Sequence, residues 1–336
     1  MQEHTDTIID AVITWVDGDD PRHIAKRNQI LGANDRQAQS ITARLGSVNE
    51  IAYCVESIIQ FAPFIRTIFI VTDEQIPDVY YAYPDRIKII DHKVIYRGYE
   101  QALPTINIFS IECMLYRIPG LAENFMYFND DFFLIKPTTP QDWFRNRHPV
   151  LRGRWEIPPE KTWYRRLAAL VGIKRDKRAS FRKTQSKAAS LLGFENRYFR
   201  CYHTPRALRK STYENFFEAH PELLLNQIQH RKRHSDQFNP YSLAWHLEIK
   251  NNTAHIASAV GIMELHNPAH KSIHQIERML QSAERKHDVL CVNIQNLNLA
   301  SADQQRIIFN WLDRIIPGGH RHRMGLNQSN DSQSAS

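Results

Sequence analysis

The sequence predicts an α/β fold, a Rossmann-like parallel or mixed sheet with helices on both faces, extended by a basic helical insertion. Apolar, β-branched runs recur over the first 140 residues, segments with helical spacing separate them, and aspartates follow several of the runs. Strands that alternate with helices imply a parallel or mixed sheet. With 336 residues, 42% of them hydrophobic and 24% charged, the chain can form one large domain.

The strand runs are short, apolar and bounded by turn residues. The first, IIDAVITWV, stops at the turn cluster DGDDP, and the second, within RTIFIVTDEQIP, ends at an aspartate. The segment NEIAYCVESIIQFAPFI between them repeats isoleucine and valine at helical spacing. In chain order, we predict strands at residues 8–16, 67–72, 86–95 and 124–135, helices at 49–65 and 105–118, a helical, His-rich segment at 202–249 and a last packed helix at 302–316.

One domain is expected over residues 1–318, with a disordered tail at 319–336. Within it we predict an α/β core at 8–150, a basic helical insertion at 151–200 and a helical completion of the site at 201–318. Between residues 152 and 187, twelve lysines and arginines accompany three acidic residues. This run is either a solvated helical excursion or a landing surface for an anionic acceptor or membrane, with Trp163, Tyr164 and Leu167 as apolar anchors.

Aspartates mark the ends of the predicted strands, and ligands of such sheets bind at the carboxyl ends of strands. Asp17, Asp73 and the adjacent pair Asp130 and Asp131, in YFNDDFFLIKP, all fall there. One carboxylate of the pair can hold a divalent cation while the other orients or deprotonates a nucleophile. The alternative is a pair of loop carboxylates that cap a helix.

Three further motifs carry candidate substrate-binding groups. TWVDGDDP offers Trp15 for stacking and Asp17 with Gly18 for a tight turn against a ligand, or is only a polar turn. YHTPR and HRKRHSD gather arginines, whose planar forks bind phosphate oxygens, and histidines, which exchange protons near neutral pH. The alternative for these two motifs is surface charge. Their candidate residues are His203, Arg206, Arg233 and His234.

Several classes of protein are excluded or disfavoured. Histidine spacing does not fit a zinc signature, and GxxxxGK[ST], GxGxxG and GxSxG are absent. The net charge of +7 suits anionic partners, but the basic run lacks interleaved aromatics, so we expect no nucleic-acid partner. Four scattered cysteines suggest reduced thiols in the cytoplasm, and without a signal-peptide core or an apolar run of roughly 20 residues, any membrane association would be peripheral.

Four ordered blocks over most of residues 8–318 resemble the Stealth family of sugar-phosphate transferases. They are IDAVITWVDGDDP; ARLGSVNEIAYCVESIIQFAPFIRTIFIVTDEQIP with LPTINIFSIECMLYRIPGLAENFMYFNDDFFLIKP; YHTPRALRKSTYENFFEAHPELLLNQIQHRKRHSDQFNPYSLAWHL; and DVLCVNIQNLNLASADQQRIIFNWLDRIIPG. The family includes bacterial capsule polymerases that transfer hexose-1-phosphate units and the animal N-acetylglucosamine-1-phosphotransferase.

The resemblance implies a GT-A-like core that binds a nucleotide diphosphate sugar, most readily a UDP-sugar, with Mg²⁺ or Mn²⁺. An acceptor hydroxyl of an oligo- or polysaccharide would attack the sugar-linked phosphate, a nucleoside monophosphate would leave, and a phosphodiester would form in a capsular or cell-surface polysaccharide. The protein would work in the cytoplasm, peripherally at the inner membrane or with the capsule-export complex. By this resemblance, the functional positions are Asp17, Arg44, Asn107, Glu112, Asp130, Asp131, His203, Arg233 and Asn293.

The chain departs from the family pattern in its fourth block, where Ile294 follows Asn293 in place of an acid, and at Leu115 and Tyr116, where a histidine is common. RLGSVNE also lacks an acidic residue often found before its Asn-Glu. These differences suggest a divergent specificity. Two other functions stay open: a metal-dependent glycosyltransferase that releases a nucleoside diphosphate, and a non-enzymatic carbohydrate- or polyanion-binding protein.

Overall fold

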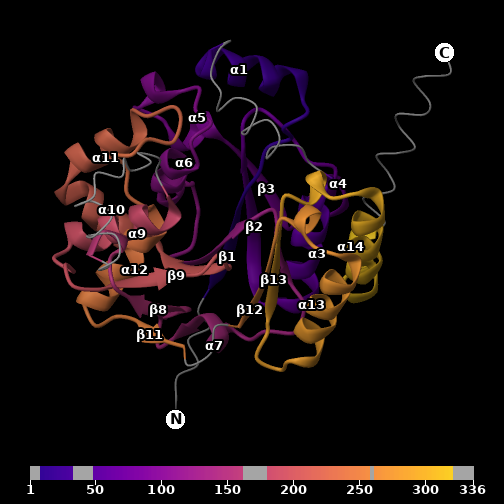
Figure 1. Cartoon of the computed structure of the whole chain (residues 1–336). Coiled ribbons are helices and arrows are strands. Elements are labelled where there is room, and N and C mark those ends of the chain that lie inside the picture. Colours follow the sequence, from indigo (N-terminus) through magenta and orange to yellow (C-terminus); the bar gives the residue numbers. More distant parts are fainter. Residues whose placement is uncertain (1–7, 33–47, 162–179, 258–260, 321–336) are drawn as a thin grey trace, which may run out of the picture.

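The computed structural model describes residues 8–32, 48–161, 180–257 and 261–320, and its centre is a five-stranded mixed sheet (Figure 1). The strand order is β10-β4-β1-β2-β3. Strands β1, β2, β3 and β4 are parallel, and β10 is an edge strand antiparallel to β4. The strands are β1 (Ile9–Thr14), β2 (Ile65–Thr72), β3 (Ile87–Asp91), β4 (Asn124–Asn129) and β10 (Arg206–Arg209). The predicted α/β fold with a mixed sheet is confirmed.

Buried side chains on both faces explain why the strands of this sheet read as nearly continuous apolar runs. Every residue of β1 is buried. Because side chains alternate along a strand, Ile9 and Ile13 join the core cluster that contains α3 (Glu50–Phe61), whereas Val12 joins the cluster that contains α6 (Ile108–Met114). Helices therefore cover both faces, as predicted.

The other helices surround these two clusters (Figure 1). None of the helices within the described residues is long and apolar enough to cross a membrane. The remaining α-helices are α1 (Pro21–Leu31), α4 (Val79–Ala82), α5 (His92–Ile95), α7 (Pro140–Trp143), α9 (Phe181–Leu191), α10 (Lys210–Ala219), α11 (Pro221–Ile228), α12 (Pro240–Lys250), α13 (Ile273–Arg285) and α14 (Ala302–Ile315). Short 3₁₀ turns occur at Glu100–Ala102, Leu115–Arg117, Pro159–Lys161, Pro268–His270 and Leu297–Leu299.

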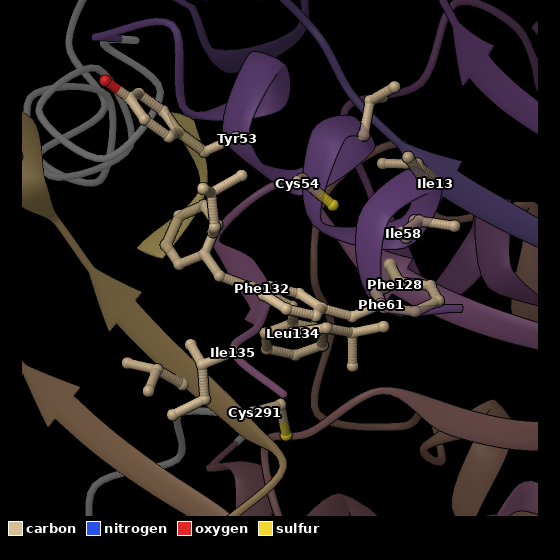
Figure 2. Close-up of a cluster of buried hydrophobic side chains, with 14 of the residues drawn as sticks. Ile13, Tyr53, Cys54, Ile58, Phe61, Phe128, Phe132, Leu134, Ile135 and Cys291 are labelled. Carbon is tan, nitrogen blue, oxygen red and sulfur yellow. The ribbon is translucent and has the colours of Figure 1, made fainter. Parts of the chain in front are cut away.

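A second sheet receives the chain directly after the carboxyl end of β4. It has the order β12 (Ile262–His266), β13 (Cys291–Gln295) and β5 (Phe132–Leu134), with β5 antiparallel to β13. The prediction of one strand over 124–135 is therefore wrong: the chain leaves β4 and turns at Asp130 and Asp131, and its next three residues pair with β13. Figure 2 shows Phe132 and Leu134 of β5 packed among Phe128, Ile58 and Phe61.

Smaller β-ladders occur beside the two main sheets, and β8 and β9 replace parts of the segment predicted as a basic helical insertion. Strands β6 (Phe144–Arg145), β7 (His148–Leu151) and β11 (His255–Ile256) form one sheet, and β8 (Gly153–Glu156) pairs with β9 (Tyr198–Cys201). In addition, β10 lies inside the segment 202–249, which we predicted as helical throughout. The reason is tertiary pairing, since β10 completes the edge of the central sheet beside β4. Residues 162–179, which include the three proposed apolar anchors, and residues 321–336 of the tail lie outside the described residues.

An ion pair between Asp10 and Arg66 lies at the start of β1 in the central sheet. The side chain of Asp10 has no exposed surface, and its carboxylate accepts a hydrogen bond from Arg66 Nε at 2.9 Å, a second from Arg66 Nη2 and a third from the Ala122 backbone N–H at 2.8 Å. Arg66 also donates to the Gly120 carbonyl at 2.8 Å. The pair therefore joins β1, β2 and the turn that precedes β4.

We expect Arg66→Ala to lower the free energy of unfolding by about 2–3 kcal/mol, because it leaves the buried Asp10 carboxylate without its charge partner. Chemical denaturation followed by circular dichroism measures this change. Arg306→Ala is the matched control, because it removes an exposed ion pair with Asp303, and we expect no measurable change. Equal stability of the two variants would contradict the role of the Asp10 pair.

Candidate active site

A cavity of about 610 Å³ lies at the carboxyl ends of β1, β2 and β4. The connection between β9 and β10 and the carboxyl ends of β12 and β13 line it as well. The position agrees with the rule that parallel sheets bind ligands at this edge. Of the residues predicted from the sequence, the cavity brings together Trp15, Glu112, Asp130, Asp131, His203, Arg206 and Arg233.

Carboxylates converge on one side of the cavity. Burial raises the pKa of Asp130 to about 7, helped by the charge of Asp131. Burial also raises the pKa of Asp131, although hydrogen bonding by Asn293 and the charge of Arg206 oppose this. Glu50, at the start of α3, is the third acid, and burial followed by the charges of both aspartates raises its pKa well above its ordinary value. Neighbouring carboxylates of like charge disfavour each other's ionised form, and a bound cation would relieve this repulsion.

Oxygen atoms without hydrogen-bond partners occur on one member of the aspartate pair and on two neighbouring asparagines. Within the described part of the chain, Asn129 Oδ1, Asp131 Oδ1 and Asn293 Oδ1 are buried and have no such partner. Asn293 is fully buried and fixed by its Nδ2, which donates to the Asp131 carbonyl at 3.2 Å. Carboxylate and amide oxygens are the donors that Mg²⁺ accepts in proteins, so these residues fit a hard divalent cation. No group of three His, Cys, Asp or Glu side chains is preassembled as a metal site among the residues described.

Basic groups lie opposite the acids. His203 Nε2 is 3.9 Å from Asp131 Oδ2, and its Nδ1 is 3.4 Å from Arg206 Nη2. Burial lowers the pKa of His203 well below its ordinary value, and the nearby charges of Arg206, His266 and Arg233 add to the effect. The neutral imidazole is therefore the form present near pH 7.

Arg206 is a buried cation held by aromatic rings. Its guanidinium lies 3.7 Å from the ring centre of Tyr241 and 5.4 Å from those of Tyr127 and Phe132. Its Nε and Nη1 are buried and make no hydrogen bond to the described residues. Burial raises the pKa of Glu112 to about 7, even though Arg206 and a hydrogen bond from Tyr127 lower it. A buried guanidinium with unused donors is suited to bind an anion such as phosphate.

A second layer holds the basic groups in place. Glu264 Oε1, on β12, accepts a hydrogen bond from the His203 backbone N–H at 3.1 Å, and its Oε2 lies 3.4 Å from His266 Nε2. Burial would raise the pKa of Glu264, but hydrogen bonds from His266 and from the His203 backbone keep it below its ordinary value. Arg233 lines the cavity from the other side, with its guanidinium 4.8 Å from the Phe109 ring centre.

Five predicted residues do not line the cavity. The Asp17 carboxylate accepts a hydrogen bond from the Asp19 N–H at 3.0 Å, and the Gly18 carbonyl accepts one from Arg27 at 3.3 Å, so both shape the turn after β1. Asn293 supports the Asp131 backbone from beneath the site. The other two are Asn107 and His234. A sixth, Arg44, lies outside the described residues.

Asn107 and His234 serve the loop that carries Arg233. Asn107 caps α6 by accepting a hydrogen bond from the Phe109 N–H at 3.2 Å, and its Nδ2 donates to the His230 carbonyl at 2.8 Å and to Gln237 at 2.9 Å. His234 is half exposed, stacks on His230 and lies 3.4 Å from an Asp236 carboxylate oxygen. These contacts tie the loop to α6, so Asn107 acts on the site through the backbone.

Sequence reasoning missed several groups that line the cavity. Glu264 and His266 lie on β12, and nothing in GIMELHNP distinguishes them from surface residues before the second sheet is known. The sequence indicates Glu50 only weakly as a site residue, because it is a carboxylate at the start of a largely apolar helix. His23, on α1, and His92, the first residue of α5, also line the cavity, and burial lowers the pKa of His92 to about 4.

Comparison with protein families identifies two conserved regions. The models described as Stealth protein CR1, conserved region 1, and Stealth protein CR2, conserved region 2, match residues 9–35 and 44–150. These ranges include Asp130, Asp131 and Glu50, and they coincide with the first two of the four blocks quoted from the sequence. The recognition of Stealth conserved regions is confirmed.

Relatives among curated proteins carry phosphotransferase names. The chain is 42% identical over 136 residues to SCO6021, an exopolysaccharide phosphotransferase of Streptomyces coelicolor. The aligned region covers 40% of this chain and 25% of that protein. It is 29% identical over 318 residues to a second, SCO2592, covering 92% of this chain and 32% of the relative. A capsular polysaccharide phosphotransferase of Actinobacillus suis is 28% identical over 320 residues, 91% of this chain and 82% of the relative. The chain thus spans about a third or less of the two Streptomyces proteins.

Solved structures resemble the chain only distantly. Mouse xyloside xylosyltransferase 1 in its apo form gives a TM-score of 0.41 at 12% identity and covers 85% of this chain and 96% of that one. The galactosyltransferase LgtC with donor and acceptor sugar analogues gives 0.42 at 8% identity, covering 90% and 95%. Structural similarity at this level does not identify the role of any residue in the site.

The aspartate pair should make stability depend on pH. Because the pKa of Asp130 is raised from 3.8 to about 7, the native state holds more protons than the unfolded chain between those values, and rising pH lowers the free energy of unfolding. We expect Asp130→Asn to gain stability relative to the natural chain by on the order of 2 kcal/mol between pH 4.5 and 7.5, measured by denaturation in EDTA. Asp303→Asn, an exposed control, should show a constant difference. A constant difference for Asp130→Asn would refute the assignment.

Proposed function

We propose that this chain, which carries Stealth conserved regions 1 and 2, is a phosphotransferase for cell-surface polysaccharides. Its substrate would be a nucleotide diphosphate sugar, most readily a UDP-sugar, and it would transfer a hexose- or N-acetylhexosamine-1-phosphate to a sugar hydroxyl. One observation carries the proposal: a single cavity holds oxygen donors for a cation on one side and buried arginine for a phosphate on the other. The names of the relatives support the same reaction class.

In this reaction the acceptor oxygen forms a bond to the phosphorus attached to the sugar. The bond from that phosphorus to the bridging oxygen breaks, and the nucleoside monophosphate leaves with the electron pair. The acceptor proton passes to a base in the cavity. Such transfers depend on positioning and on neutralisation of charge more than on covalent participation by the protein.

The acidic side of the cavity would hold Mg²⁺ or Mn²⁺. Asp130 or Asp131, with the amide oxygen of Asn293 or Asn129, supplies oxygen ligands. When bound, the cation supplies charge neutralisation for the diphosphate. Asn293 would contribute from β13, a strand of the second sheet, and the pairing of β13 with β5 holds it beside Asp131.

The basic side of the cavity would hold the phosphates. Arg206 offers buried, unused donors, and Arg233 lines the same cavity from the loop after α11. Fixed donors directed at developing charge stabilise a transition state more than water does. Trp15 and Arg44 would frame the nucleotide or sugar, and Asp17 would contribute through the turn after β1 that it shapes. His203 or one carboxylate of the Asp130–Asp131 pair would accept the proton.

The basic run would hold the growing anionic polymer or keep the enzyme beside the inner membrane and its export machinery. The residues proposed for this role, Arg165, Arg166, Lys174 and Arg175, lie outside the described residues. The positive charge of the whole chain, +7, supports the choice of an anionic partner. The proposed setting is cytoplasmic, with peripheral association at the membrane.

The released nucleotide identifies the reaction. With Mg²⁺, a panel of UDP- and GDP-sugars and short oligosaccharide acceptors, we expect UMP or GMP and a phosphorus-containing product, separated by anion exchange. Asp130→Ala, Asp131→Ala and Arg233→Ala should each lower turnover on the order of 10²-fold or more, because the aspartates would hold the cation or accept the proton and Arg233 would neutralise phosphate charge in the transition state. Asp303→Ala is the surface control and should stay active.

The other outcomes of this assay decide against the proposal. Release of UDP or GDP would show a glycosyltransferase that uses the same aspartates. Release of no nucleotide with any donor in the panel would favour a binding protein. Full turnover of both Asp130→Ala and Asp131→Ala would remove the aspartate pair from the mechanism.

A cation should stabilise the folded chain. Because it binds only the assembled oxygen ligands and relieves repulsion between the carboxylates, we expect 5 mM Mg²⁺ to raise the midpoint of thermal unfolding of EDTA-treated protein by about 3 °C or more. Asp131→Asn should lose most of this rise. Sodium chloride at equal ionic strength is the control for screening. Equal rises for the natural chain and Asp131→Asn would place the cation elsewhere.

A further inference from the structure

The two nitrogens of the His203 ring face chemically different neighbours. Nδ1 lies 3.4 Å from Arg206 Nη2, and Nε2 faces Asp131 Oδ2 at 3.9 Å. A guanidinium carries only donors and stays charged at every working pH. The contact at Nδ1 is therefore a hydrogen bond only when Nδ1 offers its lone pair. A neutral imidazole in that state carries its proton on Nε2.

Neither partner is free to turn away from this contact. The Arg206 guanidinium is packed against the rings of Tyr241, Tyr127 and Phe132. The His203 ring meets Phe132 edge-on at 4.9 Å between ring centres, and its backbone N–H is fixed by Glu264. A ring protonated at Nδ1, alone or together with Nε2, would direct an N–H at the buried guanidinium and lose this hydrogen bond, which is costly for a buried donor.

We propose that Arg206 is a positioning residue that holds His203 in the tautomer protonated at Nε2, so that His203 donates a hydrogen bond and does not act as the base. The inference rests on the phosphotransferase function proposed above and decides between its two candidate bases. The proton of the acceptor hydroxyl goes to a carboxylate of the Asp130–Asp131 pair as the new oxygen–phosphorus bond forms and the nucleoside monophosphate leaves. His203 Nε2–H is directed at Asp131 and at the oxygen atoms that bind beside it.

This assignment gives each group in the cavity a separate task. A donor at Nε2 stabilises negative charge on Asp131 or on a phosphate oxygen without a change in its own protonation. Arg206 acts on the reaction through the imidazole, and its Nε and Nη1 are buried without a hydrogen bond to the described residues. A lysine could not replace it, since the aromatic contacts and the fixed fork geometry belong to a planar guanidinium.

The tautomer can be read without substrate. In protein labelled with ¹⁵N-histidine, long-range proton–nitrogen spectra at pH 7.5 distinguish protonated from unprotonated ring nitrogens, and the signal missing in His203→Gln identifies His203 among the 16 histidines. We expect Nε2 to be protonated and Nδ1 to be unprotonated. A proton on Nδ1, or on both nitrogens, would overturn the proposal. Arg206→Gln, which can accept as well as donate, should allow a mixture of tautomers.

Matched substitutions test the role in turnover. The amide nitrogen of Gln reaches the place of Nε2, whereas the side chain of Asn reaches only the place of Nδ1. We expect His203→Gln to keep nucleoside monophosphate release within about tenfold of the natural chain, while His203→Asn and His203→Ala lose about 10²-fold or more. If His203→Gln falls as far as His203→Ala, His203 is the base and the proposal is wrong.

Failure of this inference can be distinguished from failure of the function. If the natural chain releases no nucleoside monophosphate, the proposed reaction is wrong, and the nitrogen spectra still decide the tautomer. If it does release the monophosphate and the spectra show a proton on Nδ1, only the role of Arg206 is wrong. Circular dichroism on Arg206→Gln confirms that it folds, and the spectrum of the natural chain suffices if it does not.

Discussion

Two neighbouring, partly buried carboxylates at a junction between two sheets are the constraint on which the rest of the site depends. The chain ends β4 in the central sheet, turns at Asp130 and Asp131, and joins β5 to the second sheet. Because the two sheets meet there, ligand groups from the first sheet and from β13 come within reach of the same carboxylates. Removing the junction would separate the acids from Asn293 and leave only a polar strand end.

The electrostatics of the cavity follow from this arrangement. Three acids with raised pKa values lie at the junction, and Arg206, buried among aromatic rings, lies across from them. Burying either group alone would be unfavourable, because each would lack compensation for its lost hydration. Cavities that keep opposite charges apart, with unused hydrogen-bonding atoms on both sides, are suited to a ligand that carries both a cation and phosphates.

The sequence predicted the core of the central sheet because its strands are apolar on both faces and helices alternate with them. It also predicted the aspartate pair and the His203, Arg206 and Arg233 motifs, which the fold brings into one cavity. Strand β5 could not be predicted, since three residues acquire strand form only by pairing with β13, far along the chain. Glu264 and His266 were missed for the same reason, and Asn107 shows the converse, a motif residue whose contacts are those of a helix cap.

The pairing of β8 with β9 has a consequence for how such an enzyme can diversify. Glu156 and Tyr198 are opposite one another in this ladder, so the chain leaves and returns at nearly the same point. Helix α9 lies between them, and its Phe181 lines the cavity with its ring centre 5.9 Å from that of His203. Changes that leave α9 in place need not move His203, which β9, β10 and Glu264 also position. A segment anchored in this way can change in length and charge while the reaction centre stays fixed. Under the proposed function, selection for new acceptors can act on the part of this excursion outside α9 and leave the chemistry intact.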